Sequence, residues 1–213
     1  MATDALAGVA IRGLGPGERC ALLVSEMQRG IVDAALTDLP GLADHVAVRD
    51  VVGRIAGLAH AARRHGVPVV WCTIEPRADR VGTASNSLLS ALIVKGSLVA
   101  GTESVALADG LDVDARDVVI ARVHGLTMFH GTELDAVLRS LGVTTVVLTG
   151  VSTDVALSGA AIEAVNHGYR VVLPADCAAG SSPEAFERRL EELFPLLGTV
   201  TDSATVVASW ESP

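Results

Sequence analysis

The stretch that decides the fold is Thr144–Asn166, which reads TTVVLTGVSTDVALSGAAIEAVN. An apolar run rich in β-branched residues passes through Gly150 into small polar residues and then into a helical pattern. This order predicts a buried parallel strand that turns directly into a helix. Such a turn exposes the first free N–H groups of the helix, and ligands of open α/β sheets bind at this edge.

Similar alternation of strands and helices runs along the rest of the chain. The expected strands are Cys20–Ser25, Pro68–Thr73, Val118–Ala121, Thr144–Thr149, Arg170–Leu173 and Thr199–Thr201. The expected helices are Asp44–Gly66, Leu88–Val94, Thr132–Leu141 with Thr132 as its cap, Asp154–Asn166 and Pro183–Leu193, and Ser203–Ser209 closes the chain. Right-handed crossovers between such strands predict a three-layer α/β/α fold, with a six-stranded parallel sheet of order 3-2-1-4-5-6.

Length and composition favour one domain. The chain has 213 residues, of which 50% are hydrophobic, enough for a sizeable core. The Gly-rich residues 1–18 are expected to form a flexible N-terminal arm, and residues 19–213 a single domain. The net charge of −9 and the scattered basic residues argue against a nucleic-acid partner.

The sequence also bears on the compartment of the protein. No apolar run approaches the roughly 18–20 residues of a membrane span, and no signal peptide is evident at the N-terminus. Three cysteines are an odd number without C-x-x-C spacing, which is typical of reduced thiols. We therefore expect a cytoplasmic protein with no membrane partner.

Polar residues follow the two strands that the predicted order makes neighbours. Glu26 directly follows the first strand, and Ser152–Asp154 follows the fourth, so a ligand crevice is expected between them. Glu26 is either a general acid or base or a carboxylate bonded to loop backbone. Ser152 and Thr153 either bind the ligand or start the helix, and Asp154 is either a ligand contact or a cap.

The end of the third strand carries Arg122 and His124, with His130 six residues beyond His124. Arg122 could neutralise an anionic substrate and His124 could shuttle a proton, while His130 is better read as a helix-start residue. The backbone N–H groups around Val155 and Ala156 could hold a developing negative charge. No H-x-x-x-H or D-x-H spacing indicates a metal site, so we expect neither metal nor cofactor.

Three stretches resemble the isochorismatase-like hydrolase superfamily, also called the cysteine hydrolase family. They read ALLVSEMQRGIVD, MFHGTELDAVLRSLGVTTVVLTGVSTDV and AVNHGYRVVLPADCAAG. The resemblance covers residues 20–209 and implies a six-stranded parallel sheet with helices on both sides, usually in an oligomer. It also implies a cis peptide near Val151–Ser152.

Members of that family commonly use an Asp–Lys–Cys triad, and this chain departs from it at all three positions. Glu26 stands at the Asp position, Arg122–Val123 at the Lys position, and Ala156 at the Cys position. The only lysine, Lys95, lies far upstream of the third strand. Because alanine cannot form a thioester, the usual route through an acyl-enzyme is closed at this position.

The resemblance leaves two main functions open. The first is a hydrolase that acts on a small anionic metabolite without a cysteine, with Glu26 as general acid or base and Arg122 and His124 on the anionic group. The residues expected to bind the substrate are Gln28, Phe129, Ser152, Thr153, Val155 and Ala156. The second is a catalytically inactive ligand-binding or scaffold protein of the same fold.

A weaker third hypothesis keeps cysteine chemistry, with Cys72 or Cys177 as the nucleophile. Cys72 lies inside a strand, and Cys177 is expected one strand away from the crevice, so neither position favours it. Residues 30–46 and 75–104 are expected to shape the pocket. Helix faces rich in Ala, Gly and Val favour a homo-oligomer, a dimer or a tetramer.

Overall fold

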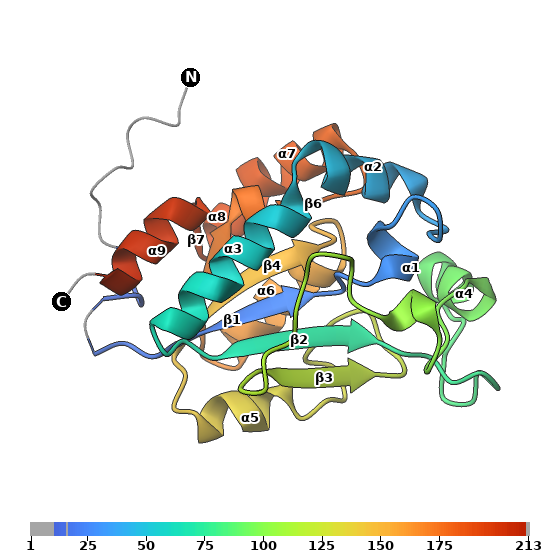
Figure 1. Ribbon diagram of the computed structural model, residues 1–213, viewed down its shortest axis with the longest axis horizontal. Helices are drawn as coiled ribbons and strands as arrows, with labels where there is room; N and C mark the ends of the chain where they lie inside the picture. Colours follow the sequence, from blue (N-terminus) through green and yellow to red (C-terminus); the bar gives the residue numbers. More distant parts are fainter. Residues whose placement is uncertain (1–10, 16, 212–213) are drawn as a thin grey trace.

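Parallel strands form the centre of the molecule, as the computed structural model of residues 11–15 and 17–211 shows (Figure 1). The described strands are β1 Cys20–Ser25, β2 Val69–Ile74, β3 Val118–Arg122, β4 Thr145–Val151, β5 Arg170–Pro174, β6 Ala178–Ala179 and β7 Thr199–Thr201. They pair in the order β3-β2-β1-β4-β5-β7, and the two-residue β6 pairs with the end of β4. The predicted sheet order is confirmed, and β6 is an addition that the sequence pattern did not indicate.

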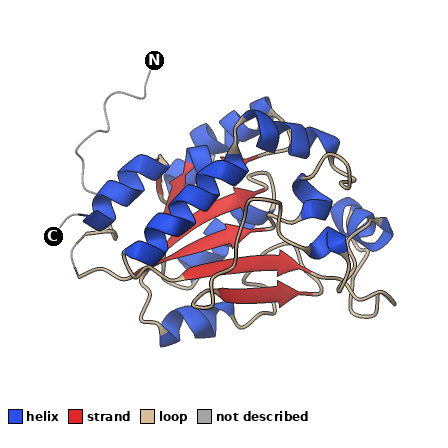
Figure 2. Cartoon of the chain, in the orientation of Figure 1, coloured by secondary structure: helices blue, strands red, loops and turns tan. Residues whose placement is uncertain are grey.

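Helices cover both faces of this sheet (Figure 2). The described α-helices are α1 Arg29–Val32, α2 Pro40–Val48, α3 Val51–Arg64, α4 Leu88–Lys95, α5 Leu134–Ser140, α6 Ala156–Asn166, α7 Pro183–Glu192, α8 Phe194–Leu197 and α9 Ser203–Glu211. Two short 3-10 helices, η1 Glu103–Val105 and η2 Ala175–Cys177, lie between them. The N-cap of α5 is Glu133, not Thr132 as predicted, while the Thr132 hydroxyl, one position earlier, accepts a hydrogen bond from Leu134 N–H at 3.2 Å.

Two predicted helices have different limits in the structure. The helix expected over Asp44–Gly66 is two helices, α2 and α3, because Asp50 adopts a left-handed conformation with φ of 52° between them. The helix expected from Asp154 begins at Ala156 instead. The side chain of Asp154 accepts a hydrogen bond from Ser181 N–H at 2.6 Å and so ties the turn to the loop after β6.

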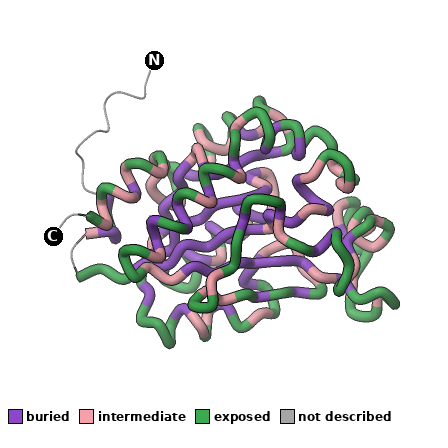
Figure 3. Tube along the Cα trace, in the orientation of Figure 1, coloured by how far each residue is buried: buried purple, intermediate pink, exposed green. Residues whose placement is uncertain are grey.

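Alternate residues of the central strands enter separate core layers. In β1, Leu22 and Val24 pack with α3 and α9, while Ala21 and Leu23 pack with α5 and α6. This alternation follows from the two-residue period of a strand whose two faces are both covered. Figure 3 shows the resulting pattern, with buried residues along the strands and exposed ones on the outer sides of the helices.

The start of the chain is only partly described. Residues 1–10 and 16 of the predicted arm lie outside the described residues, whereas Ile11 and Leu14 are buried in the core that includes α9. None of the helices in the described part of the chain is long and apolar enough to cross a membrane.

Candidate active site

A cavity lies at the carboxyl ends of the central strands, where the sequence predicts a crevice. It holds about 690 Å³ of empty space, its open mouth included. Its polar lining residues are Glu26, Asp38, Ser97, Arg122 and Ser152. Ten Leu, Ile and Val residues supply most of the remaining wall. The cavity therefore has a few polar groups at its floor and mouth and an aliphatic body.

Glu26 sits on the floor because it is the first residue beyond β1. Its backbone N–H donates to Cys72 O at 2.9 Å, which continues the pairing between β1 and β2. Its φ of 53° is left-handed, a conformation that costs a non-glycine residue about 1 kcal/mol. Departures of this kind cluster at functional sites, where the surrounding structure holds them in place. The side chain is 15% exposed, so it reaches the cavity while remaining largely enclosed.

Arg122 ends β3 and reaches across β2 to Glu26. Its Nη2 donates to Oε1 of Glu26 in an ion pair, and its side chain is only 4% exposed. The other two guanidinium nitrogens, Nε and Nη1, are buried and have no hydrogen-bond partner among the described residues. A buried donor without a partner costs free energy, so Arg122 carries unsatisfied donors beside the cavity that it lines.

The turn after β4 forms the third side of the floor. Ser152, Val155 and Ala156 line the cavity, and the peptide between Val151 and Ser152 is cis, as the resemblance implies. Ala156, the first residue of α6, is the position that the resemblance assigns to a cysteine. Thr153 is fully buried and lies outside the lining, with its N–H donating to Ala179 O at 2.9 Å.

Two further residues predicted to bind substrate lie away from the cavity. Gln28 is fully buried and braces β2, because its amide donates to Ile74 O and accepts from Ile74 N–H at 3.0 and 2.8 Å. Phe129 is buried and stacks on His167 and Tyr169 at ring distances of 5.4 and 6.2 Å. The structure thus gives both residues packing roles.

His124 lies in a neighbouring cavity instead of on the floor. That cavity is also lined by His130 and Glu163, and the two histidine rings meet edge to face at 5.6 Å. The two cavities share wall residues, including Ile74 and Leu126. His124 therefore lines the neighbouring cavity and is not among the residues that line the cavity of Glu26 and Arg122.

All three cysteines are buried. Burial raises the pKa of Cys72 to about 12, against a smaller opposite effect of the Arg122 charge. Burial also raises the pKa values of Cys20 and Cys177. Because the thiolate is the nucleophile, these environments disfavour cysteine chemistry. Within the described residues, no group of three His, Cys, Asp or Glu side chains is placed to hold a metal ion.

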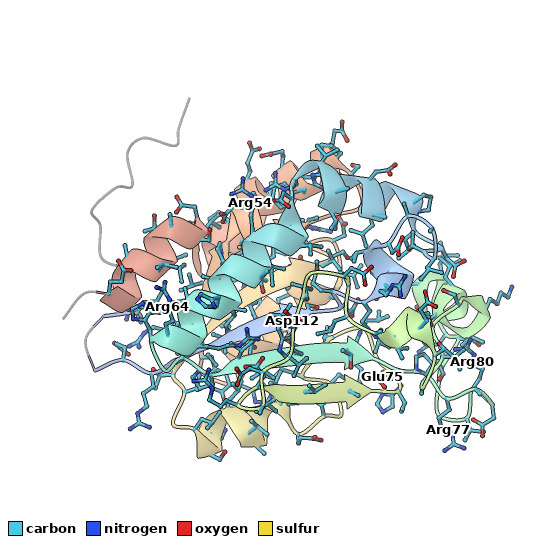
Figure 4. The ribbon with its side chains drawn as sticks, in the orientation of Figure 1. Arg54, Arg64, Glu75, Arg77, Arg80 and Asp112 are labelled. Atoms are coloured by element: carbon cyan, nitrogen blue, oxygen red, sulfur yellow. The ribbon has the colours of Figure 1, made fainter. Side chains whose placement is uncertain are left out.

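The outer wall of the cavity comes from α4 and the segment after it, within the predicted range 75–104. Arg80 fixes this segment, because its guanidinium donates to Leu98 O at 2.7 Å and to Gly96 O at 2.9 Å. Figure 4 shows Arg80 on the α4 side of the molecule, beyond Glu75 at the end of β2. The individual wall residues, such as Leu89 and Leu92, were not predicted, since they read as part of an ordinary apolar helix.

Comparisons with known proteins agree with this architecture. An isochorismatase domain model matches residues 20–205. The chain is 30% identical over 206 residues to a ureidoacrylate amidohydrolase RutB from Methylorubrum extorquens, covering 90% of this chain and 82% of the relative. It is 28% identical over 200 residues to a maleamate amidohydrolase from Pseudomonas putida, covering 93% of this chain and 90% of the relative. The crystal structure of a cysteine hydrolase from Pseudomonas syringae pv. phaseolicola superposes with a TM-score of 0.80 at 25% identity, covering 95% of both chains.

Proposed function

The chain belongs to the isochorismatase family, and from that premise we propose that it is a hydrolase of a small anionic metabolite that works without a cysteine nucleophile. The observation that carries the proposal is the ion pair of Glu26 and Arg122 on the floor of a cavity walled by the Ser152–Ala156 turn. Relatives named as amidohydrolases support a substrate with an amide or ureide bond, and a vinyl ether is a further class to test.

Glu26 acts first as a base and then as an acid in this proposal. Its carboxylate accepts a proton from a water molecule, whose oxygen bonds to the electrophilic carbon of the substrate. As the bond to the leaving group breaks, Glu26 returns the proton to that group and regains its charge. Ala156 leaves room for the substrate and supplies no competing nucleophile.

Arg122 has two roles in the same site. Its bond to Glu26 orients the carboxylate, and its positive charge attracts an anionic group of the substrate to the cavity that it lines. Backbone N–H groups at the start of α6 stabilise the negative charge that develops on the substrate. His124 has no step in this mechanism, because it lies in the neighbouring cavity.

A Glu26→Gln variant tests the proposal, because glutamine keeps the shape and removes the proton acceptor. We expect turnover to fall by at least 10²-fold on a substrate found by screening amides, ureides and vinyl ethers. The matched control is Glu75→Gln, a carboxylate at the same sheet edge whose Oε1 accepts from Thr73 and which is not part of the cavity lining. That variant should keep full turnover.

Two outcomes would contradict the proposal. Full turnover in a folded Glu26→Gln protein would show that another group handles the proton. No turnover by the unmodified protein across all three classes, together with a saturable thermal shift from one of them, would favour the inactive ligand-binding protein instead. The loss of the triad cysteine at Ala156 is the feature that makes this second outcome worth testing.

A further inference from the structure

The wall of the active-site cavity points to the kind of substrate that fits it. Resting on the proposed function, we propose that the substrate is amphipathic, with one polar reacting head on the floor and an unbranched or lightly branched aliphatic body against α4. The polar floor is limited to the Glu26–Arg122 pair and the turn at Ser152. Apart from Asp38 and Ser97, the other lining residues are aliphatic residues and glycines, so burial of methylene groups is favourable there and burial of unpaired polar groups is costly.

Helix α4 carries the main part of this argument. Three residues of α4 and its C-cap glycine line the cavity. They recur at intervals of three and four positions, namely Leu89, Leu92, Ile93 and Gly96. Residues at this spacing lie on one face of a helix, so α4 turns a single apolar face toward the cavity.

The same face is only partly buried by protein, with Ile93 packed against the core layer that includes α3 and α9. Within the described helix α4, Ser90 is the single buried residue, and Leu92 remains 43% exposed. A helix with a leucine and isoleucine face normally buries that face in a core. Here the face borders the cavity, so an aliphatic ligand would complete its burial.

This wall is held in place before any ligand arrives. Ser87 and Ser90 form a capping box at the start of α4, and Arg80 binds the carbonyls of Gly96 and Leu98 beyond its end. Asp38 accepts a hydrogen bond from Ser97 N–H at 3.0 Å and links the wall to the loop before α2. A preformed wall spares the ligand the cost of ordering it.

Charge beside the α4 wall limits what the far end of the ligand can be. Asp38 lines the cavity, and together with Asp154 it also lines an adjacent pocket that shares Leu89 and Leu92 with the cavity. Two carboxylates on this side disfavour a second anionic group there. The body of the substrate therefore ends without negative charge, and the one anionic group belongs at Arg122.

Binding of straight-chain carboxylates, from propanoate to octanoate, tests the inference by isothermal titration calorimetry. We expect affinity to rise about fourfold for each added methylene until the cavity is filled, the value for one buried CH₂. Leu89→Asn and Leu92→Asn should each reduce this gain per methylene. The matched control, Leu196→Asn, changes an 81% exposed leucine outside the cavity lining and should leave the gain unchanged.

An affinity that does not depend on chain length would overturn the inference. It would also be overturned if the affinity gained per methylene were the same in the Leu89→Asn and Leu92→Asn variants as in Leu196→Asn. Because this experiment measures binding without turnover, its result is separate from that of the proposed function. A protein that hydrolyses nothing can still show the chain-length dependence, and an active enzyme can lack it.

Discussion

At the scale of single residues, Asp117 is a buried carboxylate outside the cavity that accepts several hydrogen bonds. Its side chain is 2% exposed and accepts two hydrogen bonds from Arg63 and one, at 2.8 Å, from the indole N–H of Trp71. Burial opposes its ionisation, but these hydrogen bonds outweigh burial and lower the pKa of Asp117. The network joins α3 to the segment that enters β3.

We predict that Asp117→Ala lowers the free energy of unfolding by about 2–3 kcal/mol at neutral pH, because it leaves Arg63 and Trp71 without their acceptor. Urea unfolding measures the difference. The control is Asp79→Ala, which removes an exposed carboxylate paired with Arg77 and should cause no measurable loss. Equal losses in the two variants would contradict the prediction.

The pH dependence of this loss has a definite sign. Since the folded-state pKa of Asp117 is lowered, its contribution is complete above the unfolded value of about 3.9 and disappears as the pH falls through the folded value. The difference between the unmodified protein and Asp117→Ala should therefore shrink below about pH 4. A difference that grew on acidification would show that another group dominates.

At the scale of elements, the parts that could be predicted are those set by local pattern. The short apolar runs at β1 and β4 each bury both faces, so their position and parallel pairing follow from the sequence. The break between α2 and α3 could not be predicted, because the apolar stripe continues past it and only the backbone of Asp50 departs from the helix. The two-residue β6 is too short to leave a pattern.

In the candidate site, too, only the residues placed by local sequence pattern could be predicted. Glu26, Arg122 and Ala156 were predicted because they follow strand ends that the sheet order brings to one edge. Gln28 is two residues from Glu26 and Phe129 is seven residues from Arg122, yet both side chains are buried in packed interiors. The direction in which a loop side chain points depends on tertiary contacts, which the neighbouring residues in sequence do not encode. The position of the apolar wall formed by α4 depends on tertiary contacts in the same way.

The junction of β1 and β4 leads to a prediction about Gly150. Its φ is 97°, and a Cβ there would overlap the carbonyl oxygen of Ser25 and lie 2.9 Å from its nitrogen. Gly150→Ala should therefore lower the free energy of unfolding by about 3 kcal/mol or more, through backbone strain and overpacking. Urea unfolding measures this loss of stability, and the m value should stay unchanged.

Gly57 provides the matched control for that variant. It lies in the middle of α3, and a Cβ there would meet nothing within 4 Å. Gly57→Ala should raise the free energy of unfolding by about 0.5–1 kcal/mol, because alanine loses less conformational entropy in a helix. A Gly150→Ala protein as stable as Gly57→Ala would mean that β1 and β4 do not approach closely at this point.

At the scale of the whole molecule, the three cysteines are distributed over both core layers. Cys20 and Cys177 belong to the layer that includes α3 and α9, and Cys72 belongs to the layer that includes α5 and α6. None is more than 8% exposed, and burial raises the pKa of each. A reagent for thiolates can therefore reach them only when the fold opens.

We predict that iodoacetamide modifies none of the three cysteines in the native protein at pH 8 and all three in urea, as mass spectrometry would count. The positive control is Ala156→Cys, which places a thiol on the cavity wall at the start of α6, where the helix N-terminus lowers a thiol pKa. That variant should gain one rapid modification in the native state. Rapid native modification of Cys72 or Cys177 would instead revive cysteine chemistry in this chain, because it would show a thiolate that the buried geometry does not allow.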